Sequence, residues 1–192
     1  MDAEFNRRPL KTRSRGWAQA LARAATRTGI SANAISLAGI GFAVLGAAAF
    51  LLTPQGWHWW LVAALAIQLR LLANMLDGLV AVEGERASPT GPLFNEVPDR
   101  IEDSLLLIAA GYAAGLGELG WLAALLAMAT AYVRLLGGSL GFAQSFAGPM
   151  AKQHRMAVLT LAALISAALP GQPVLAVSLG LIAAGAALTT LR

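Results

Sequence analysis

Long apolar runs follow one another along most of this chain, and they restrict what it can fold into. Several have about 20 residues, the length that a helix needs to cross the hydrocarbon core of a membrane. Only 12% of the residues are charged, whereas a soluble domain carries about 25%. We therefore predict an all-α integral membrane protein with six transmembrane helices. The predicted spans are residues 31–52, 57–82, 93–116, 121–147, 156–169 and 173–191.

A basic segment, residues 1–29, precedes the first span and carries seven of the 14 Lys and Arg residues. From Trp17 onward apolar residues recur at helical spacing, opposite Arg23 and Arg27. This pattern is typical of an amphipathic helix that lies in the headgroup region with a tryptophan anchor. A disordered basic tail is the alternative. We therefore divide the chain into this juxtamembrane segment and a transmembrane bundle over residues 30–192.

The distribution of basic residues predicts the orientation of the bundle. The turns at residues 53–56, 117–120 and 170–173 contain no Lys or Arg. Six spans with both termini on one side place every basic loop on that side, which the positive-inside rule makes cytoplasmic. We expect a multi-pass protein of the bacterial inner (cytoplasmic) membrane, whose basic residues face membrane lipids. Nucleic acid is not an expected partner, since no base-stacking aromatic residues are interleaved with the basic ones.

Seven of the 10 acidic residues fall between Asn74 and Asp103, inside or beside two of the apolar runs. Carboxylates at the mouth of a membrane bundle are costly and usually mark function. These residues are Asp77, Glu83, Glu85, Glu96, Asp99, Glu102 and Asp103. The alternative is a solvated cytoplasmic rim, balanced by Arg86 and Arg100.

Helical spacing brings part of this acidic stretch onto two stripes. The stripe on the second span, at i, i+3, i+4 and i+7, is Asn74, Asp77, Gly78 and Ala81. The stripe on the third span, at i, i+4 and i+8, is Asn95, Asp99 and Asp103. Two facing helices would converge oxygen ligands, which hard divalent cations prefer. We therefore predict a site for one or two Mg²⁺ or Mn²⁺ ions.

The combined pattern, Asn74-x-x-Asp77-Gly78-x-x-Ala81 … Gly91-x-x-x-Asn95-x-x-x-Asp99, resembles the signature of the CDP-alcohol phosphotransferases. That signature is D-x-x-D-G-x-x-A-R followed by G-x-x-x-D-x-x-x-D. In that family the acids hold divalent metal ions that grip the pyrophosphate of a CDP-linked lipid. The last aspartate deprotonates the acceptor alcohol, which attacks the β-phosphorus and releases CMP. The resemblance implies a homodimer in phospholipid biosynthesis that transfers a phosphatidyl-type group from CDP-diacylglycerol to a small hydroxyl acceptor.

The resemblance assigns roles by position. Asp99 is the implied catalytic base and a metal ligand. The other implied metal ligands are Asn74, Asp77 and Asn95, and the implied nucleotide- or pyrophosphate-binding residues are Gly78, Ala81, Arg86 and Gly91.

The chain departs from the signature at three of these positions. Asn74 and Asn95 stand where the family has Asp, and Val82 stands where it has Arg. The four core positions then carry two negative charges rather than four, which balances one divalent ion. We expect Arg86 to replace the missing arginine. The acids expected to supply the missing charge are Glu96, Glu102 and Asp103.

A second basic set lies on the same predicted side: Arg134 in the fourth span, and Lys152 and Arg155 before the fifth. These residues are candidates for binding the phosphate of an acceptor or a lipid headgroup. A topology signal alone is the alternative.

Two other functions stay open. The paired Asn residues favour a catalytically degenerate protein that binds a nucleotide-lipid or a partner without transfer. Charges inside apolar runs also allow a small transporter. Acids gathered at one face and the lack of an inverted repeat disfavour the transporter.

Overall fold

The structure, a computed structural model, describes residues 16–83, 91–142 and 148–191. Over these ranges the chain is helical and contains no strand, which confirms the predicted all-α class. A short 3-10 turn, η1 (Thr53–Gln55), joins the second helix to the third. The α-helices are α1 (Gly16–Arg27), α2 (Ala32–Leu52), α3 (His58–Glu83), α4 (Gly91–Ala113), α5 (Gly117–Ser139), α6 (Lys152–Ala168) and α7 (Val174–Thr190).

The predicted apolar runs coincide with α2 to α7, with corrections at both ends of α5 and at the start of α6. The turn predicted at residues 117–120 is wrong, because the chain turns at Gly115, whose φ of 70° suits glycine, and α5 already begins at Gly117. The same helix ends at Ser139, in a glycine-rich stretch, instead of continuing to residue 147. α6 begins at Lys152, inside the predicted basic loop, and is therefore longer than predicted.

Three of the described helices are long and apolar enough to cross a membrane. They are Ala32–Gln55, which includes α2 and η1, most of α3 at His58–Ala81, and α5 at Gly117–Ser139. α7 is apolar too but has only 17 residues. These helices agree with the predicted membrane protein.

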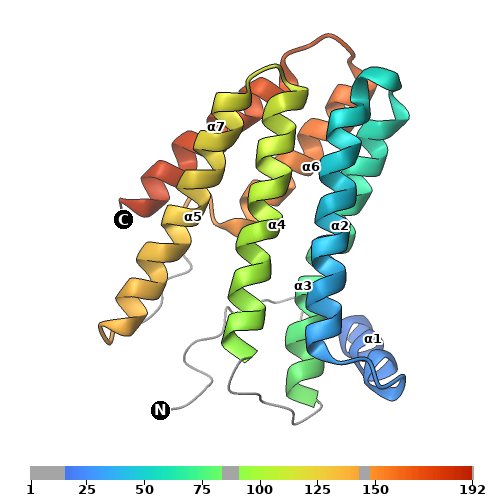
Figure 1. Cartoon of the computed structure of the whole chain (residues 1–192), viewed down its shortest axis with the longest axis vertical. Coiled ribbons are helices and arrows are strands. Elements are labelled where there is room, and N and C mark those ends of the chain that lie inside the picture. Colours follow the sequence, from blue (N-terminus) through green and yellow to red (C-terminus); the bar gives the residue numbers. More distant parts are fainter. Residues whose placement is uncertain (1–15, 84–90, 143–147, 192) are drawn as a thin grey trace.

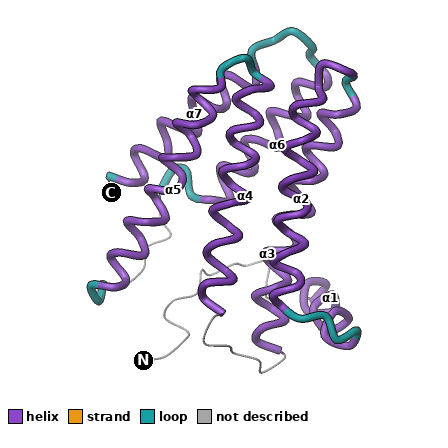
Figure 2. Tube along the Cα trace, viewed as in Figure 1, coloured by secondary structure: helices purple, strands orange, loops and turns teal. Residues whose placement is uncertain are grey.

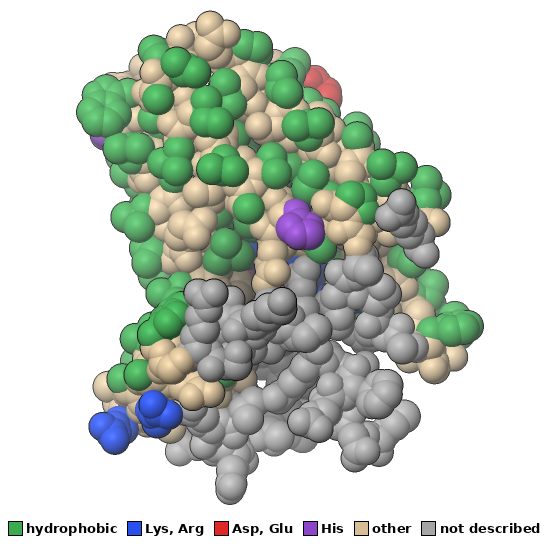
Figure 3. Space-filling model, turned by 180° about the vertical axis from the view of Figure 1, so that it is seen from behind, with side chains coloured by type: hydrophobic (Ala, Val, Ile, Leu, Met, Phe, Trp, Pro, Cys, Tyr) green, Lys and Arg blue, Asp and Glu red, His purple; other side chains and the backbone are tan. Residues whose placement is uncertain are grey.

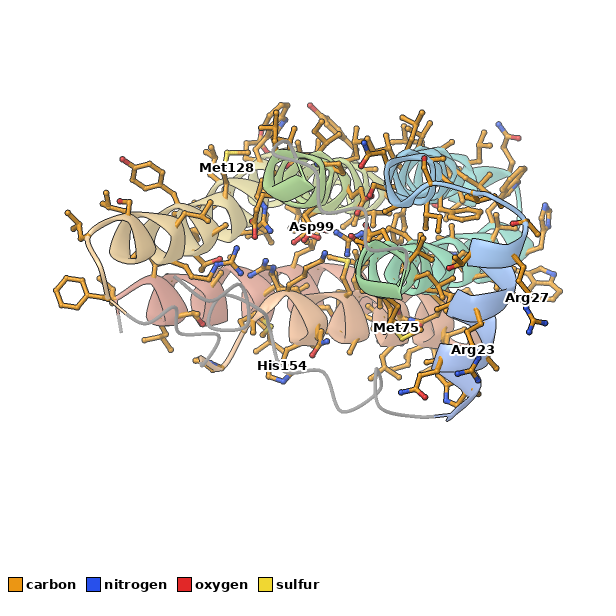
Figure 4. All side chains as sticks on the ribbon, turned by 90° about the horizontal axis from the view of Figure 1, so that it is seen from below. Arg23, Arg27, Met75, Asp99, Met128 and His154 are labelled. Carbon is orange, nitrogen blue, oxygen red and sulfur yellow. The ribbon has the colours of Figure 1, made fainter. Side chains whose placement is uncertain are left out.

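Helices α2 to α7 form a closed ring. α2 lies against α3 and α4, α4 against α5, α5 against α7, α7 against α6, and α6 against α3. Seen along the bundle, the ring consists of two rows, one of α5, α4 and α2 and the other of α7, α6 and α3 (Figure 4). α1 packs on the outside of this ring, against α3. Side chains that point inward from these helices therefore meet in the interior of the ring.

Small residues line the closest contacts between helices, and many large apolar residues point outward. A Cβ at Gly111 would lie 2.6 Å from Gly120 Cα, so the backbones of α4 and α5 touch there. On the outside, Leu65, Leu125 and Leu181 are 60%, 61% and 58% exposed. Figure 3 shows hydrophobic atoms spread over the upper part of one face, with Lys and Arg at the lower left and in small patches at mid-height. An apolar exterior of this extent suits a lipid environment.

The two ends of the ring differ in charge. The turns α2–α3, α4–α5 and α6–α7 meet at one end, at the top of Figures 1 and 2, and contain no Lys or Arg. α3 runs away from this end and α4 returns toward it. The C-terminal half of α3 and the N-terminal half of α4 therefore lie together at the opposite end, and most of the described acids of the acidic stretch lie on them.

Candidate active site

Four helices bring charged side chains together at the end of the ring opposite the turns. These residues lie near the middle of α3, in the N-terminal half and middle of α4, in the C-terminal half of α5 and in the N-terminal half of α6. Asp99 points into the space between the helices, whereas His154 points away from it (Figure 4). We define an inner network as Arg70, Glu102, Asp103 and Arg155. We define an outer network as Glu96, Asp99, Arg100, Arg134 and Lys152.

Arg70 is the centre of the inner network, and its side chain is completely buried in α3. Its Nε donates to Glu102 Oε2 at 2.6 Å, and its Nη2 donates to Asp103 Oδ1 at 2.6 Å. Nη2 also lies 3.8 Å from Asp99 Oδ1 in the outer network. A buried arginine needs such partners, because an unpaired charge in the interior is very costly. Arg70 therefore ties α3 to three successive acids of α4.

Arg155 joins α6 to the same network. Its Nη2 donates to Asp103 Oδ2 at 3.0 Å, and its Nη1 donates to the carbonyl oxygen of Met150 at 2.9 Å. Its side chain is 2% exposed. Each oxygen of Asp103 is thus held by a different arginine, from α3 and from α6. This arrangement places Arg155, a predicted phosphate-binding residue, in a buried structural ion pair.

Asn74 lies one helical turn beyond Arg70 and also contacts the inner network. Its Nδ2 donates to Glu102 Oε2 at 2.7 Å and to the Arg70 carbonyl oxygen at 3.2 Å. The other oxygen of Glu102, Oε1, is buried and has no hydrogen-bond partner among the described residues. It lies against α2, where a Cβ at Gly39 would come within 2.5 Å of it. α3 therefore contacts one oxygen of this buried glutamate, and α2 leaves room for the other.

Asp99, the predicted base, lies in the outer network and contacts cations on both oxygens. Lys152 Nζ donates to Oδ1, and Arg100 Nη2 lies 3.4 Å from Oδ2. The side chains of Asp99 and Lys152 are each 13% exposed, so both remain accessible from the end of the bundle. The two cations orient the carboxylate without burying it.

Glu96 and Arg134 form the rim of the outer network. Arg134 Nη2 donates to both carboxylate oxygens of Glu96, at 2.8 Å each. Arg100 Nη2 lies 3.3 Å from Glu96 Oε2, one helical turn along α4. These pairs join α5 to α4 at the open end of the ring.

Asp77 belongs to neither network and faces α2. Ser36 Oγ donates to Asp77 Oδ2 at 2.7 Å, while Asp77 Oδ1 is buried without a partner among the described residues. Asp77 itself is only 4% exposed. A buried carboxylate oxygen without a donor carries an uncompensated desolvation cost. A bound cation is one partner that would remove this cost.

Some predicted site residues are only partly described. Gly78 and Ala81 lie on α3 just past Asp77 and are half-buried. Gly91 is the first residue of α4, and Asn95 lies in the same helix, although its side chain is outside the described part. Arg86 lies outside the described residues altogether.

The described residues offer oxygen donors for one hard cation, but they do not form a cluster of carboxylates around it. No group of three or more His, Asp or Glu side chains is arranged to hold a metal within the described ranges. The reason is that arginine and lysine already pair with most of the acids. Asp77 nevertheless offers a free buried oxygen and Asp99 an accessible one, which are the oxygen donors that Mg²⁺ and Mn²⁺ prefer.

No family model matches the chain. The phosphatidylinositol phosphate synthase of Mycolicibacterium smegmatis is 33% identical over 97 residues. The matched stretch covers 50% of this chain and only 42% of that protein, so the chain spans less than half the length of this curated relative.

Solved structures of the phosphatidylinositol phosphate synthase of Mycobacterium tuberculosis match over most of the chain. The complex with manganese and citrate has a TM-score of 0.76 at 20% identity, over 91% of this chain and 85% of that one. The form with CDP-DAG bound has a TM-score of 0.74 at 21% identity, over 91% and 89%. The fold is that of a phosphatidylinositol phosphate synthase. This agreement in fold is in line with the motif's resemblance to the CDP-alcohol phosphotransferases.

Within this synthase fold, two polar residues of the site had no role assigned from the sequence. Arg70 is an arginine inside an apolar run, four residues before Asn74 and on the same helical stripe. Ser36 carries a hydroxyl in the second turn of a mostly apolar helix. Both polar residues stand out in the sequence. Their hydrogen-bond partners, however, lie on other helices and cannot be found from local spacing.

Proposed function

We propose that this chain is a metal-dependent CDP-alcohol phosphotransferase. It would transfer a phosphatidyl-type group from a CDP-linked lipid, CDP-diacylglycerol, to a small hydroxyl acceptor and release CMP. The observation that carries the proposal is the location of Asp77 and Asp99 at the same end of the bundle, in a synthase fold. The mycobacterial synthases of that fold have been solved with manganese and with CDP-DAG.

In the proposed reaction, Asp99 takes the proton of the acceptor hydroxyl. The acceptor oxygen then forms a bond to the β-phosphorus of the donor, the bond from that phosphorus to the bridging oxygen breaks, and CMP leaves with the electron pair. Lys152 and Arg100 hold Asp99 in place on its two oxygens. When bound, the metal neutralises charge on the phosphate oxygens. Asp77 and Asp99 would hold it, with Asn74 and Asn95 at the remaining motif positions.

We assign the acceptor side of the site to the outer network. Lys152 contacts the proposed base directly, and Arg134 lies at the open rim with a side chain 16% exposed. Charge-assisted hydrogen bonds to phosphate are strong, so these cations would hold a phosphorylated acceptor beside Asp99. Arg155 would instead stabilise the position of α6. Gly78, Ala81, Gly91 and Arg86 remain the proposed nucleotide-binding residues.

We place all six helices of the ring across the bacterial inner membrane, with the charged end and both termini cytoplasmic. The uncharged turns at the opposite end support this orientation. α1 would lie at the interface, because Ala18 and Ala22 are buried while Trp17 is 51% exposed. Arg23 and Arg27 point away from the ring (Figure 4). A homodimer is proposed from the family resemblance.

CMP release by the purified protein tests the proposal. The assay would contain CDP-diacylglycerol, Mg²⁺ or Mn²⁺, and in turn glycerol 3-phosphate, inositol phosphate, inositol or serine. We expect release that needs both the metal and one acceptor. Glu118→Gln is a matched control, because this exposed carboxylate lies at the start of α5, at the opposite end of the ring.

Binding without transfer is the second candidate. Asn74, at a position where the family has a metal-binding Asp, is engaged with Glu102, and this observation favours it. Intact binding of the donor with no CMP release from any acceptor would overturn the transferase proposal and support this candidate.

A further inference from the structure

The contact between Asn74 and Glu102 explains why an amide stands where the signature has a carboxylate. Glu102 can only accept hydrogen bonds, so the NH₂ group of Asn74 must face it. The distance is 2.7 Å. A carboxylate at position 74 would put two negatively charged oxygens at this separation, one of them on the fully buried Glu102. The amide at 74 is therefore matched to the acid at 102.

Glu102 is fully buried and is held on one oxygen by two donors. Arg70 Nε and Asn74 Nδ2 both reach Oε2, at 2.6 and 2.7 Å. The absence of a side chain at Gly39 makes room for Oε1 on the other side. Burying a carboxylate is costly unless cations and hydrogen bonds compensate for it. The three helices α2, α3 and α4 thus supply a site built for one negative charge at position 102.

We propose that Glu102 carries the negative charge that the signature places at position 74, and that Arg70, Asn74 and Glu102 form one positioning unit. Arg70 is the countercharge of Glu102, whereas the family's aspartate at position 74 would face a metal ion. Because Nδ2 is fixed on Glu102, Asn74 Oδ1 is the atom left to face the site. The site then binds one divalent ion instead of two. This inference rests on the proposed function for its catalytic meaning, but the unit itself can be tested without turnover.

A reciprocal exchange tests the unit. The variants are Asn74→Asp, Glu102→Gln and the two changes together, each purified in detergent. We expect Asn74→Asp alone to lower the Tm by about 5 °C, since it sets a second carboxylate against the buried Glu102. In the double variant the new amide at 102 donates to the new carboxylate at 74, and Arg70 retains an acceptor. We expect the Tm to return most of the way to that of the unchanged protein, a clear departure from additivity.

Manganese binding provides a second readout. Electron paramagnetic resonance of the unchanged protein with CDP should count one Mn²⁺ per chain. The double variant returns a negative charge to position 74, where the signature has an aspartate. It should therefore bind Mn²⁺ about tenfold more tightly than the unchanged protein. A merely structural hydrogen bond would leave this affinity unchanged. Glu118→Gln serves as the control for both readouts.

The outcomes separate this inference from the proposed function. If the Tm losses of the single variants simply add in the double variant, or if the unchanged protein binds two Mn²⁺ ions, the inference is overturned. If Asn74→Asp does not fold, recovery of folded double variant supports the inference, and failure of both overturns it. Thermal coupling without CMP release would leave the positioning unit standing and remove the transferase proposal.

Discussion

The inner and outer networks contain the same kinds of side chain at the same end of the ring, yet they differ in exposure. Side chains of the inner network are 0–3% exposed, and those of the outer network are 13–28% exposed. Ion pairs removed from water are costly and persist only where every charge has a partner. Accessible pairs are weaker and can exchange a partner for a ligand. The comparison indicates that the inner network fixes the helices and the outer network meets the substrates.

The largest expected effect is on turnover, in the outer network. Asp99→Asn removes the proposed base, and we expect the rate of CMP release to fall by about 10³-fold. The Tm should change little, because Asp99 is accessible and the inner network is intact. Single-turnover CMP release together with donor binding would measure this. Full turnover by this variant would remove Asp99 from its proposed role.

The inner network should show the opposite behaviour, a large loss of stability. Arg155→Gln leaves one oxygen of Asp103 buried without its cation, and we expect a loss of about 3–5 kcal/mol in the free energy of unfolding. Denaturant unfolding in detergent is the measurement. The matched control is Arg134→Gln in the outer network, which should cost less than about 1 kcal/mol. Equal losses for the two variants would contradict the division into inner and outer networks.

The sequence was sufficient for those features of the fold and site that depend on local pattern. Hydropathy located the helices of the ring, and helical spacing placed Asp77 and Asp99 at the same end. The turn before α5 was misplaced because glycines at 115 and 117 offer similar local signals. Arg70 was missed as an organising residue because its partners lie on α4, and the register of one helix against another is a long-range property.

Lys152 should have a smaller effect, confined to one substrate. Its ammonium group donates a hydrogen bond to the proposed base, Asp99, and lies at the open end of the site. Lys152→Gln should raise the KM for a phosphorylated acceptor by about 10–100-fold, since it removes one charged hydrogen-bond donor. The KM for CDP-diacylglycerol should change much less. Steady-state kinetics with each substrate varied in turn would separate these effects, and an equal rise in both KM values would argue against an acceptor role.

The smallest expected effect concerns Asp77, which lies outside both networks. Ser36 Oγ donates to one oxygen of Asp77, and the other is left for a cation. Ser36→Ala removes the donor without adding bulk, so the carboxylate loses its orientation but keeps its charge. We expect the apparent affinity for Mn²⁺ to fall by about fivefold, the size of one modest hydrogen bond. Because the metal must be bound for transfer, saturating Mn²⁺ should restore the rate of CMP release.

A loss of rate that saturating Mn²⁺ does not restore would mean that Ser36 acts on folding or donor binding. Asp77 would then have to be held in place for metal binding by something other than α2.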